Sequence, residues 1–324
     1  MYERKTVESY LKKNYQNLGS IKLIKNLSHT PNSQNYLFQT KNGKYVFRYI
    51  TDHPSPSKIS QTCKVLKYLE TKSLPVQEII KSDCGKFCNS KNFIYVTKFY
   101  EGIFSKGTFN ELKDLAINVA TLHKFLNQTK IKFNFEHDTD SSFQILSMFD
   151  IKRMRKIIEQ RKNKSYFDKK ILKNLELLKQ IICEQNKKNE LKPNVSQLIH
   201  NDLTASNIIF HKNKVKVILD FNGMKKGDIL EDIAFTSLRF STINNFKKSD
   251  VEKKINFFLK HYLNYNDVDE KKFSCLQIYS VNNLLSKISY LLKKNYFYDD
   301  QLWLNDFDHF FKLLKCSYQI SWPD

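Results

Sequence analysis

Short apolar runs with polar residues at their edges, in two neighbouring segments, constrain the fold of this chain more than any other feature. Residues 198–210 read LIHNDLTASNIIF, and residues 215–223 read VKVILDFNG. Within them, residues 207–210 and 215–219 are short runs rich in β-branched or aromatic residues, joined by the polar HKNK, a pattern that predicts a β-hairpin. Because a hairpin holds its two ends together, we expect Asn207, which begins one strand, to lie near Asp220, which ends the other.

The polar residues around this hairpin have the types and the spacing that phosphoryl transfer needs. Asp202 and Asn207 are spaced as in the catalytic loop of kinases, where the Asp accepts the proton of the substrate hydroxyl and the Asn binds a metal ion. Asp220 opens an Asp-Phe turn after a strand, and a carboxylate is a hard oxygen ligand of the kind that Mg²⁺ prefers. Asp and Asn also occur in turns and at helix caps, so the inference depends on the complete set and its order.

Beyond this spacing, the chain resembles a known family, the kinase-fold small-molecule phosphotransferases. The segments that carry the resemblance are HNDLTASN, ILDFN and EDIA, all within residues 198–235, and a weaker resemblance extends over 35–50 and 91–126. The family includes aminoglycoside phosphotransferases, choline and ethanolamine kinases, and a type of homoserine kinase. The resemblance implies a two-lobe protein-kinase-like fold, in which Asp232 of EDIA matches an aspartate that braces the catalytic loop.

The resemblance also implies a role for each polar residue of the motif. Asp202 is the expected catalytic base, and His200 belongs to the same catalytic loop as a structural member, while Asn207 and Asp220 are the expected Mg²⁺ ligands. The His-Asn-Asp form of the loop is especially similar to choline kinases. Those enzymes usually carry Glu where this chain has Asn222, which leaves other acceptors open beside an amino alcohol.

The first hundred residues read as a small lobe of antiparallel sheet that would bind the nucleotide. We predict an opening amphipathic helix, strands at 21–27, 35–40, 44–50 and 92–99, and a helix at 57–70. Asn42-Gly43 is a strong tight-turn signal between two of these strands. In KYVFRYI the side chains point alternately to the two faces of the strand, which places the charge of Arg48 on an otherwise apolar face. Burying that charge is costly unless an anion binds it. By the resemblance, a Lys or Arg here holds the phosphates of ATP; the alternative is that Arg48 reaches solvent from an edge strand.

Four further residues complete the predicted nucleotide site. The loop at 28–35, which should cover the phosphates, contains no Gly, so Ser33 and Asn35 are expected to donate hydrogen bonds from their side chains. Gln61 lies in the helix region where the family offers a Glu to the cation, and it would hydrogen-bond the guanidinium without neutralising it. Glu101 lies in the predicted hinge, whose backbone would meet the adenine.

The rest of the chain reads as a larger, mostly helical lobe. Helices are predicted at 109–126, 141–161, 166–186, 249–263, 268–294 and 299–318. Their aromatic residues recur at core spacing, and His123 likewise reads as a core histidine, so packing explains them. We therefore predict an α+β fold, with a nucleotide-binding lobe over residues 1–100 and a catalytic and substrate-binding lobe over residues 101–324.

Composition bears on the compartment and on macromolecular partners. No apolar run approaches the ~18 residues of a membrane span, the N-terminus has no signal-peptide pattern, and the six scattered Cys residues indicate reduced thiols, so a cytoplasmic protein is expected. The net charge of +21 raises nucleic-acid binding as a separate hypothesis. The Lys residues are spread along the chain without a recognition motif, which argues against it.

Together these observations predict a phosphotransferase that uses ATP and Mg²⁺ and acts on a hydroxyl of a small metabolite. The acceptors that fit are a choline- or ethanolamine-like amino alcohol, homoserine or a sugar, and an aminoglycoside antibiotic is the alternative. The missing Gly and Glu motivate a further hypothesis, a catalytically weak kinase-fold binding protein. Only GMKKGDIL separates Asn222 from Glu231, which is too short for the activation segment that docks peptides in protein kinases.

Overall fold

The computed structural model of the chain describes residues 3–27, 33–51, 55–131, 145–188, 197–298 and 304–323. By their contacts, the residues form two compact units. The first comprises residues 1–136, 197–226 and 264–266, and the second comprises residues 137–196, 227–263 and 267–324. The predicted lobe boundary after residue 100 is a different division and stays a prediction. Over the described ranges, no helix is both long and apolar enough to cross a membrane.

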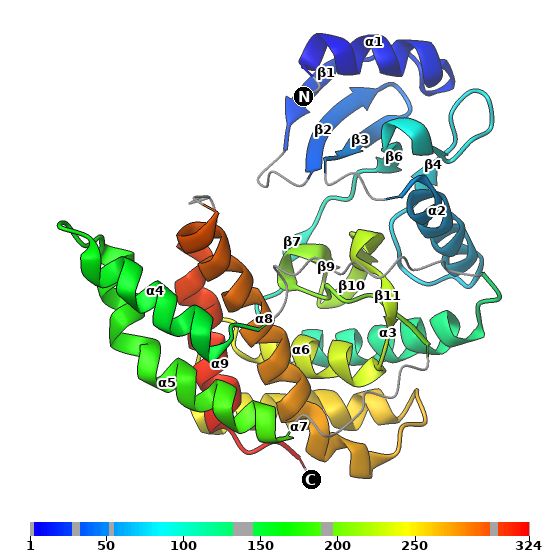
Figure 1. Ribbon diagram of the computed structural model, residues 1–324. Coiled ribbons are helices and arrows are strands. Elements are labelled where there is room, and N and C mark those ends of the chain that lie inside the picture. Colours follow the sequence, from blue (N-terminus) through cyan, green and yellow to red (C-terminus); the bar gives the residue numbers. More distant parts are fainter. Residues whose placement is uncertain are drawn as a thin grey trace. The chain divides into compact units, whose positions relative to one another are not determined.

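The first unit contains an antiparallel sheet with the strand order β1-β2-β3-β6-β4, and β5 also pairs with β6 (Figure 1). The strands are β1 Leu23–Asn26, β2 Ser33–Thr40, β3 Gly43–Ile50, β4 Ile79–Ile80, β5 Cys88–Asn89 and β6 Ile94–Lys98. The predicted tight turn at Asn42-Gly43 is confirmed, because Thr40 pairs directly with Gly43. Gly43 has a φ of 144°, which a residue with a side chain rarely adopts.

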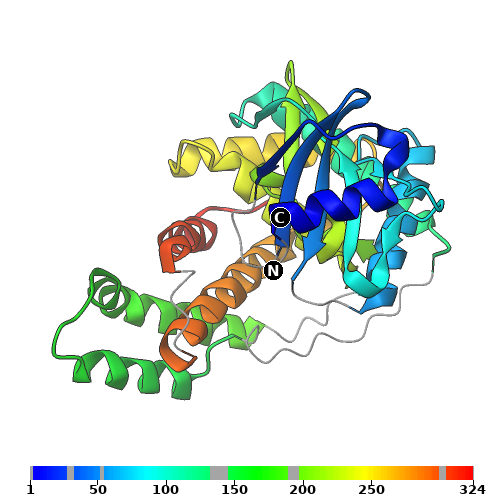
Figure 2. The same cartoon turned by 90° about the horizontal axis from the view of Figure 1, so that it is seen from above.

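One face of this sheet carries a hydrophobic core closed by α1, Arg4–Asn14. Figure 2 shows α1 lying across the strands. Val7 and Leu11, one helical turn apart, are buried against Phe38 and Phe47 of the sheet. Because side chains alternate along a strand, Arg48 lies on the opposite face of β3 from Phe47.

Two helices and two small sheets complete the first unit. The helix α2, Pro56–Thr71, begins with Ser55 accepting from the backbone N–H of Lys58, and α3, Phe109–Gln128, begins with a capping box of Thr108 and Glu111. A three-stranded sheet has the order β10-β9-β7, and β8 pairs with β11. These strands are β7 Ile103–Phe104, β8 Gln197–Ile199, β9 Ile208–His211, β10 Lys214–Ile218 and β11 Lys225–Gly227.

The second unit is helical in its described part. Its helices are α4 Met148–Gln160, α5 Tyr166–Lys188, α6 Ile229–Ser241, α7 Lys248–Leu263, α8 Leu276–Phe297 and α9 Phe307–Gln319. Figure 1 shows α4 beside α5 and α8 beside α9, each pair packing through its apolar stripe.

The helix predicted over 268–294 differs from the structure at its start. Residues Glu270–Cys275 form a 3₁₀ segment capped by Asp269, and α8 begins only at Leu276. The Asp269 side chain accepts from the N–H of Lys271, which favours a tight turn ahead of the helix. The predicted helix starts at 141–144 and 299–303 lie outside the described residues.

Candidate active site

The predicted hairpin is confirmed and brings Asn207 beside the end of β10. Its strands, β9 and β10, are joined by Lys212 and Asn213, whose φ angles of 49° and 62° give the left-handed two-residue turn typical of hairpins. At the open end, the N–H of Leu219 donates to the carbonyl oxygen of Asn207 over 2.7 Å. Asp220 is the next residue, so one hairpin carries both predicted metal ligands.

His200 fastens the predicted catalytic loop, residues 200–207, to the same strand end. It is fully buried and packs edge-on against Phe221 at a ring distance of 4.5 Å. Its Nδ1 accepts from the N–H of Asp202 over 3.3 Å, and its Nε2 lies 3.1 Å from the carbonyl oxygen of Leu219. A carbonyl only accepts, so this pattern assigns the neutral imidazole with its proton on Nε2. His200 thus bonds to the backbone of Asp202 in the loop and of Leu219 at the end of β10, which fits a structural member of the loop.

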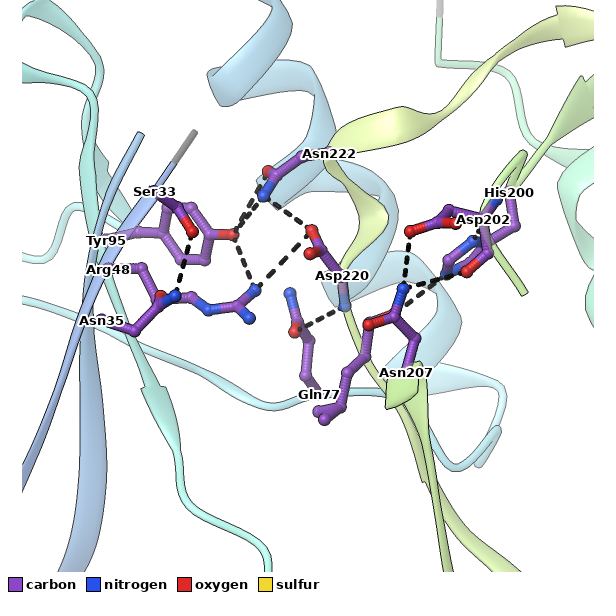
Figure 3. A network of polar contacts seen from close by, with 11 residues as sticks. Ser33, Asn35, Arg48, Gln77, Tyr95, His200, Asp202, Asn207, Asp220 and Asn222 are labelled. Atoms are coloured by element: carbon purple, nitrogen blue, oxygen red, sulfur yellow. Dashed lines mark hydrogen bonds and ion pairs between the residues drawn. The ribbon is translucent and has the colours of Figure 1, made fainter. Parts of the chain in front are cut away.

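Asp202 and Asn207 are held together by their side chains. The Asn207 amide nitrogen donates to Oδ2 of Asp202 over 2.7 Å and to the Asp202 carbonyl over 3.0 Å (Figure 3). These two bonds orient the amide, and within the described part of the chain no hydrogen bond engages its Oδ1. Oδ1 of Asp202 is likewise left to accept a proton or a hydrogen bond from another molecule.

Asp220 has a left-handed backbone, with φ 60° and ψ 68°. A residue other than Gly in this region is uncommon and is found at functional sites more often than elsewhere. The conformation is supported at both ends of the residue: the N–H donates to Oε1 of Gln77 over 3.1 Å, and Oδ1 accepts from the Asn222 amide over 2.9 Å. The carboxylate is 35% exposed, so one oxygen is oriented by the protein while the group stays accessible.

Arg48 faces this carboxylate from the sheet. Its Nη1 lies 3.9 Å from Oδ1 of Asp220 and donates to the hydroxyl of Tyr95 over 3.3 Å. The Tyr95 hydroxyl in turn lies 3.1 Å from the Asn222 amide nitrogen. The Arg48 side chain is only 16% exposed, and burial works against its charge, yet Tyr95 and Asp220 outweigh that and raise the pKa of the guanidinium. Arg48 therefore carries a positive charge on the face of the sheet opposite Phe47. The alternative that Arg48 reaches solvent from an edge strand is wrong, because β3 is paired with β2 on one side and β6 on the other.

Ser33 and Asn35 lie on the strand next to Arg48. Asn35 pairs directly with Arg48 across β2 and β3, so both side chains lie on one face of the sheet. The amide nitrogen of Asn35 donates to the Ser33 hydroxyl over 3.0 Å. The residues of the covering loop from 28 to 32 lie outside the described residues.

Gln61 and Glu101 lie outside the hydrogen-bond network that joins Arg48, Tyr95, Asn222 and Asp220. Gln61 lies on α2, but its Oε1 is buried without a hydrogen-bond partner among the described residues, so no bond to Arg48 is formed. Glu101 is 69% exposed and pairs with Lys44 at 2.5 Å. The adjoining Gly102 is required, because a Cβ there would lie 2.7 Å from the Phe210 carbonyl oxygen of the hairpin. The nucleotide-binding roles of both residues stay predictions.

Two residues of this network were missed by the sequence reasoning. Tyr95 is paired with Arg48 in the register of β3 and β6, so the alternation in NFIYVTKF, once aligned with KYVFRYI, contains the signal for it. Gln77 is brought to Asp220 across 143 residues, and no local pattern indicates that contact.

The residues present fit a hard divalent cation such as Mg²⁺. Asn207 offers an oriented amide oxygen, and Asp220 offers a carboxylate oxygen that no hydrogen bond occupies within the described ranges. No cluster of three or more His, Cys, Asp or Glu side chains suited to a metal occurs among the described residues. The candidate ligands are therefore oxygen atoms of one Asp and one Asn. Substrate phosphates and water commonly complete the coordination of Mg²⁺.

Comparison with known proteins identifies the family. The sequence pattern of the phosphotransferase enzyme family matches residues 24–248. The chain belongs to this family. The matched residues include Arg48, the catalytic loop and the hairpin. The comparison with curated protein sequences finds no significant match.

Solved structures of other phosphotransferases and kinases share the fold at low sequence identity. A spectinomycin phosphotransferase in complex with ADP and spectinomycin is 14% identical, with a TM-score of 0.70 and coverage of 98% of both chains. An amicoumacin kinase in complex with AMP-PNP, Ca²⁺ and Ami is 14% identical, with a TM-score of 0.67 and coverage of 95% of this chain and 94% of that chain. A choline kinase from Streptococcus pneumoniae is 18% identical, with a TM-score of 0.59 and coverage of 96% and 98%. The predicted α+β protein-kinase-like fold, with an antiparallel sheet lobe and a mostly helical lobe, is confirmed.

Proposed function

We propose that this protein transfers the γ-phosphoryl group of ATP to a hydroxyl of a small metabolite. The observation that carries the proposal is the grouping of Asp202, Asn207 and Asp220 at the open end of one hairpin, with Arg48 facing them. Phosphoryl transfer needs positioning and charge neutralisation more than covalent chemistry by the protein. This grouping supplies a base, two oxygen ligands and a cation.

Each side chain has a task in this reaction that its surroundings support. Asp202 orients the acceptor hydroxyl and takes its proton on Oδ1, because Oδ2 is occupied by Asn207. Asn207 and Asp220 would hold Mg²⁺, which, when bound, neutralises charge on the transferred phosphoryl group. Arg48 holds the nucleotide phosphates, with Ser33 and Asn35 donating hydrogen bonds from the neighbouring strand.

Glu101 and Gln61 belong to the proposed nucleotide site with weaker support. Glu101 follows β6 in the segment that would contact adenine, and Gln61 has a buried Oε1 that still requires a hydrogen-bond donor. The requirement for ATP favours a cytoplasmic enzyme, as we predict from the sequence.

A small acceptor is favoured over a protein acceptor. The segment after Asn222 leads through β11 directly into α6 at Ile229, so the chain has no long segment here to dock a peptide. Among the structures that share the fold are a spectinomycin phosphotransferase and a choline kinase, both named for small acceptors. Asn222 is neutral and its amide holds Asp220, so it offers no charge to an amino alcohol; homoserine, a sugar or an aminoglycoside remain alongside the amino alcohol as acceptors to test.

The test is to incubate the purified protein with γ-labelled ATP and Mg²⁺ in parallel reactions. One set contains the candidate alcohols (choline, ethanolamine, homoserine, sugars and aminoglycosides), and the other contains a protein mixture. The proposal predicts label in at least one small alcohol and none in proteins. Label in proteins alone would contradict it. ATP binding without transfer to any alcohol would favour the catalytically weak binding protein.

A further inference from the structure

Residues 75–77 run beside β10 and lead to the candidate active site. Val76 pairs with Ile218 in parallel, the N–H of Ile218 donates to the Pro75 carbonyl over 2.7 Å, and the N–H of Gln77 donates to the Ile218 carbonyl over 3.0 Å. The backbone of Gln77 is therefore fixed against the end of the strand that leads into Asp220. The side chain is 1% exposed and its Oε1 is hydrogen-bonded, so packing and this bond together hold its rotamer.

The orientation of the Gln77 amide follows from its contact with Asp220. Its Oε1 accepts from the N–H of Asp220 over 3.1 Å. Rotating the amide by half a turn would set an NH₂ group against that N–H, and two donors do not bond. The amide oxygen of Gln77 therefore faces the N–H of Asp220, and the amide nitrogen points away from that N–H.

The amide nitrogen of Gln77 has two N–H donors and no partner among the described residues. Gln77 is 1% exposed, so solvent does not take the place of a partner. Buried donors of this kind are nearly always satisfied, and leaving them unpaired is costly. Figure 3 shows the nitrogen pointing to the side on which the Arg48 guanidinium and the Asp220 carboxylate lie.

We propose that Gln77 is a phosphate-binding residue of the nucleotide site, donating from Nε2 to a phosphate oxygen that Arg48 also holds. An anion rich in acceptor oxygens satisfies the two buried donors and the guanidinium together. The same amide keeps the backbone of Asp220 in place through Oε1, so one side chain couples phosphate binding to the position of a metal ligand. This inference rests on the proposed function, because it takes ATP to be the ligand.

Two substitutions separate the two ends of the amide. Gln77→Met keeps the volume of the side chain and removes both the acceptor and the donors. Gln77→Glu keeps an acceptor for the N–H of Asp220, but it replaces the donors and sets a negative charge toward the phosphate. Gln185 supplies the matched control, because it too is 1% exposed with a partnerless Oε1 among the described residues, and it lies on α5 in the second unit. Gln185→Met and Gln185→Glu test whether burial changes alone affect binding.

The experiment is isothermal titration calorimetry with ATP and with adenosine, both with Mg²⁺, on proteins whose folding is checked by thermal denaturation. A hydrogen bond to a charged group predicts that Gln77→Met weakens ATP binding by about 10- to 100-fold. Gln77→Glu should weaken it further, while adenosine binding and both Gln185 variants stay at the wild-type value. If Gln77→Met does not fold, Gln77→Glu carries the test.

Three results would overturn the inference. ATP affinity unchanged in both Gln77 variants, with the wild type binding ATP normally, would refute the role of Gln77 alone. An equal loss of ATP and adenosine affinity would show that Gln77 only supports the fold. Absence of ATP binding by the wild type would refute the proposed function, and this inference with it.

Discussion

The catalytic loop with its hairpin and the sheet around Arg48 are built in different ways. In the loop, the bonds that fix the side chains are short in sequence: Asn207 bonds to a residue five positions away, and His200 to one nineteen positions away. Around Arg48, the contacts join distant segments: Arg48 bonds to Tyr95, 47 residues away, and faces Asp220, which in turn bonds to Gln77, 143 residues away. The loop is therefore ordered by its own segment, whereas the proposed phosphate site around Arg48, here called the phosphate side, depends on the assembly of the whole first unit.

This difference predicts which kind of defect each substitution produces. Changes in the loop and hairpin should remove chemistry and leave the fold intact, because the side chain of Asp202 bonds to nearby Asn207 and that of Asp220 to nearby Asn222. Changes around Arg48 should weaken nucleotide binding by smaller factors, since several groups share the phosphate side. The expected effect falls from Asp220 through Asp202 and Arg48 to Tyr95.

Asp220→Ala should have the largest effect. It removes the charged oxygen ligand, so Mg²⁺-dependent turnover should be lost while the protein remains folded. The rate is to be measured as a function of Mg²⁺ concentration, with circular dichroism as a check of the fold. Asn207→Ala is the graded companion, and it should weaken metal use less because a neutral amide is the poorer ligand. An unchanged rate and Mg²⁺ requirement in Asp220→Ala would place the metal site elsewhere.

Asp202→Asn should lower kcat by ~10²–10⁴-fold, the usual contribution of a positioned general base. The amide oxygen can still accept from Asn207, so the loop should keep its shape. Nucleotide affinity should stay near the wild-type value, because the group is directed at the acceptor. Steady-state kinetics with the acceptor found in the alcohol panel provide the measurement. Near-normal kcat would be incompatible with the assigned role.

Arg48→Met should raise the ATP concentration needed for half-maximal rate by about 10- to 100-fold, the range of a hydrogen bond to a charged group. Met keeps the volume of the stem and deletes the five donors. Stability should change little, because the Asp220 carboxylate that loses its partner is 35% exposed and stays in contact with solvent. Loss of folding without a specific defect in ATP use would instead assign Arg48 to a structural pair with Asp220.

Tyr95→Phe should have the smallest effect, about 5-fold in ATP affinity, which corresponds to one net hydrogen bond of about 1 kcal/mol. Arg48 loses one partner and keeps Asp220. Tyr36→Phe is the control, because Tyr36 is a buried tyrosine in the core on the other face of the sheet. ATP titrations of the two variants side by side give the comparison. Equal effects of both would remove Tyr95 from the phosphate side.

The same difference decides how much could be predicted from the sequence. The hairpin and its Asn207–Asp220 proximity were predictable because strand periodicity and turn residues act within about twenty positions. Most helices of both units were predictable from their apolar stripes. The neighbours of Arg48 were not, because the expected partner was on α2 and the observed ones come from β6 and from the hairpin. Contacts of that kind depend on strand register and packing, which local pattern does not encode.

The division of tasks between Asp202 and Asp220 is the central claim, and calorimetric titration of ATP with and without Mg²⁺ tests it most directly. The wild type and Asp202→Asn are predicted to bind one ATP per chain, and more tightly with Mg²⁺. Asp220→Ala is predicted to lose the Mg²⁺-dependent gain. The opposite pattern, with the Mg²⁺-dependent gain lost in Asp202→Asn and kept in Asp220→Ala, would contradict the account.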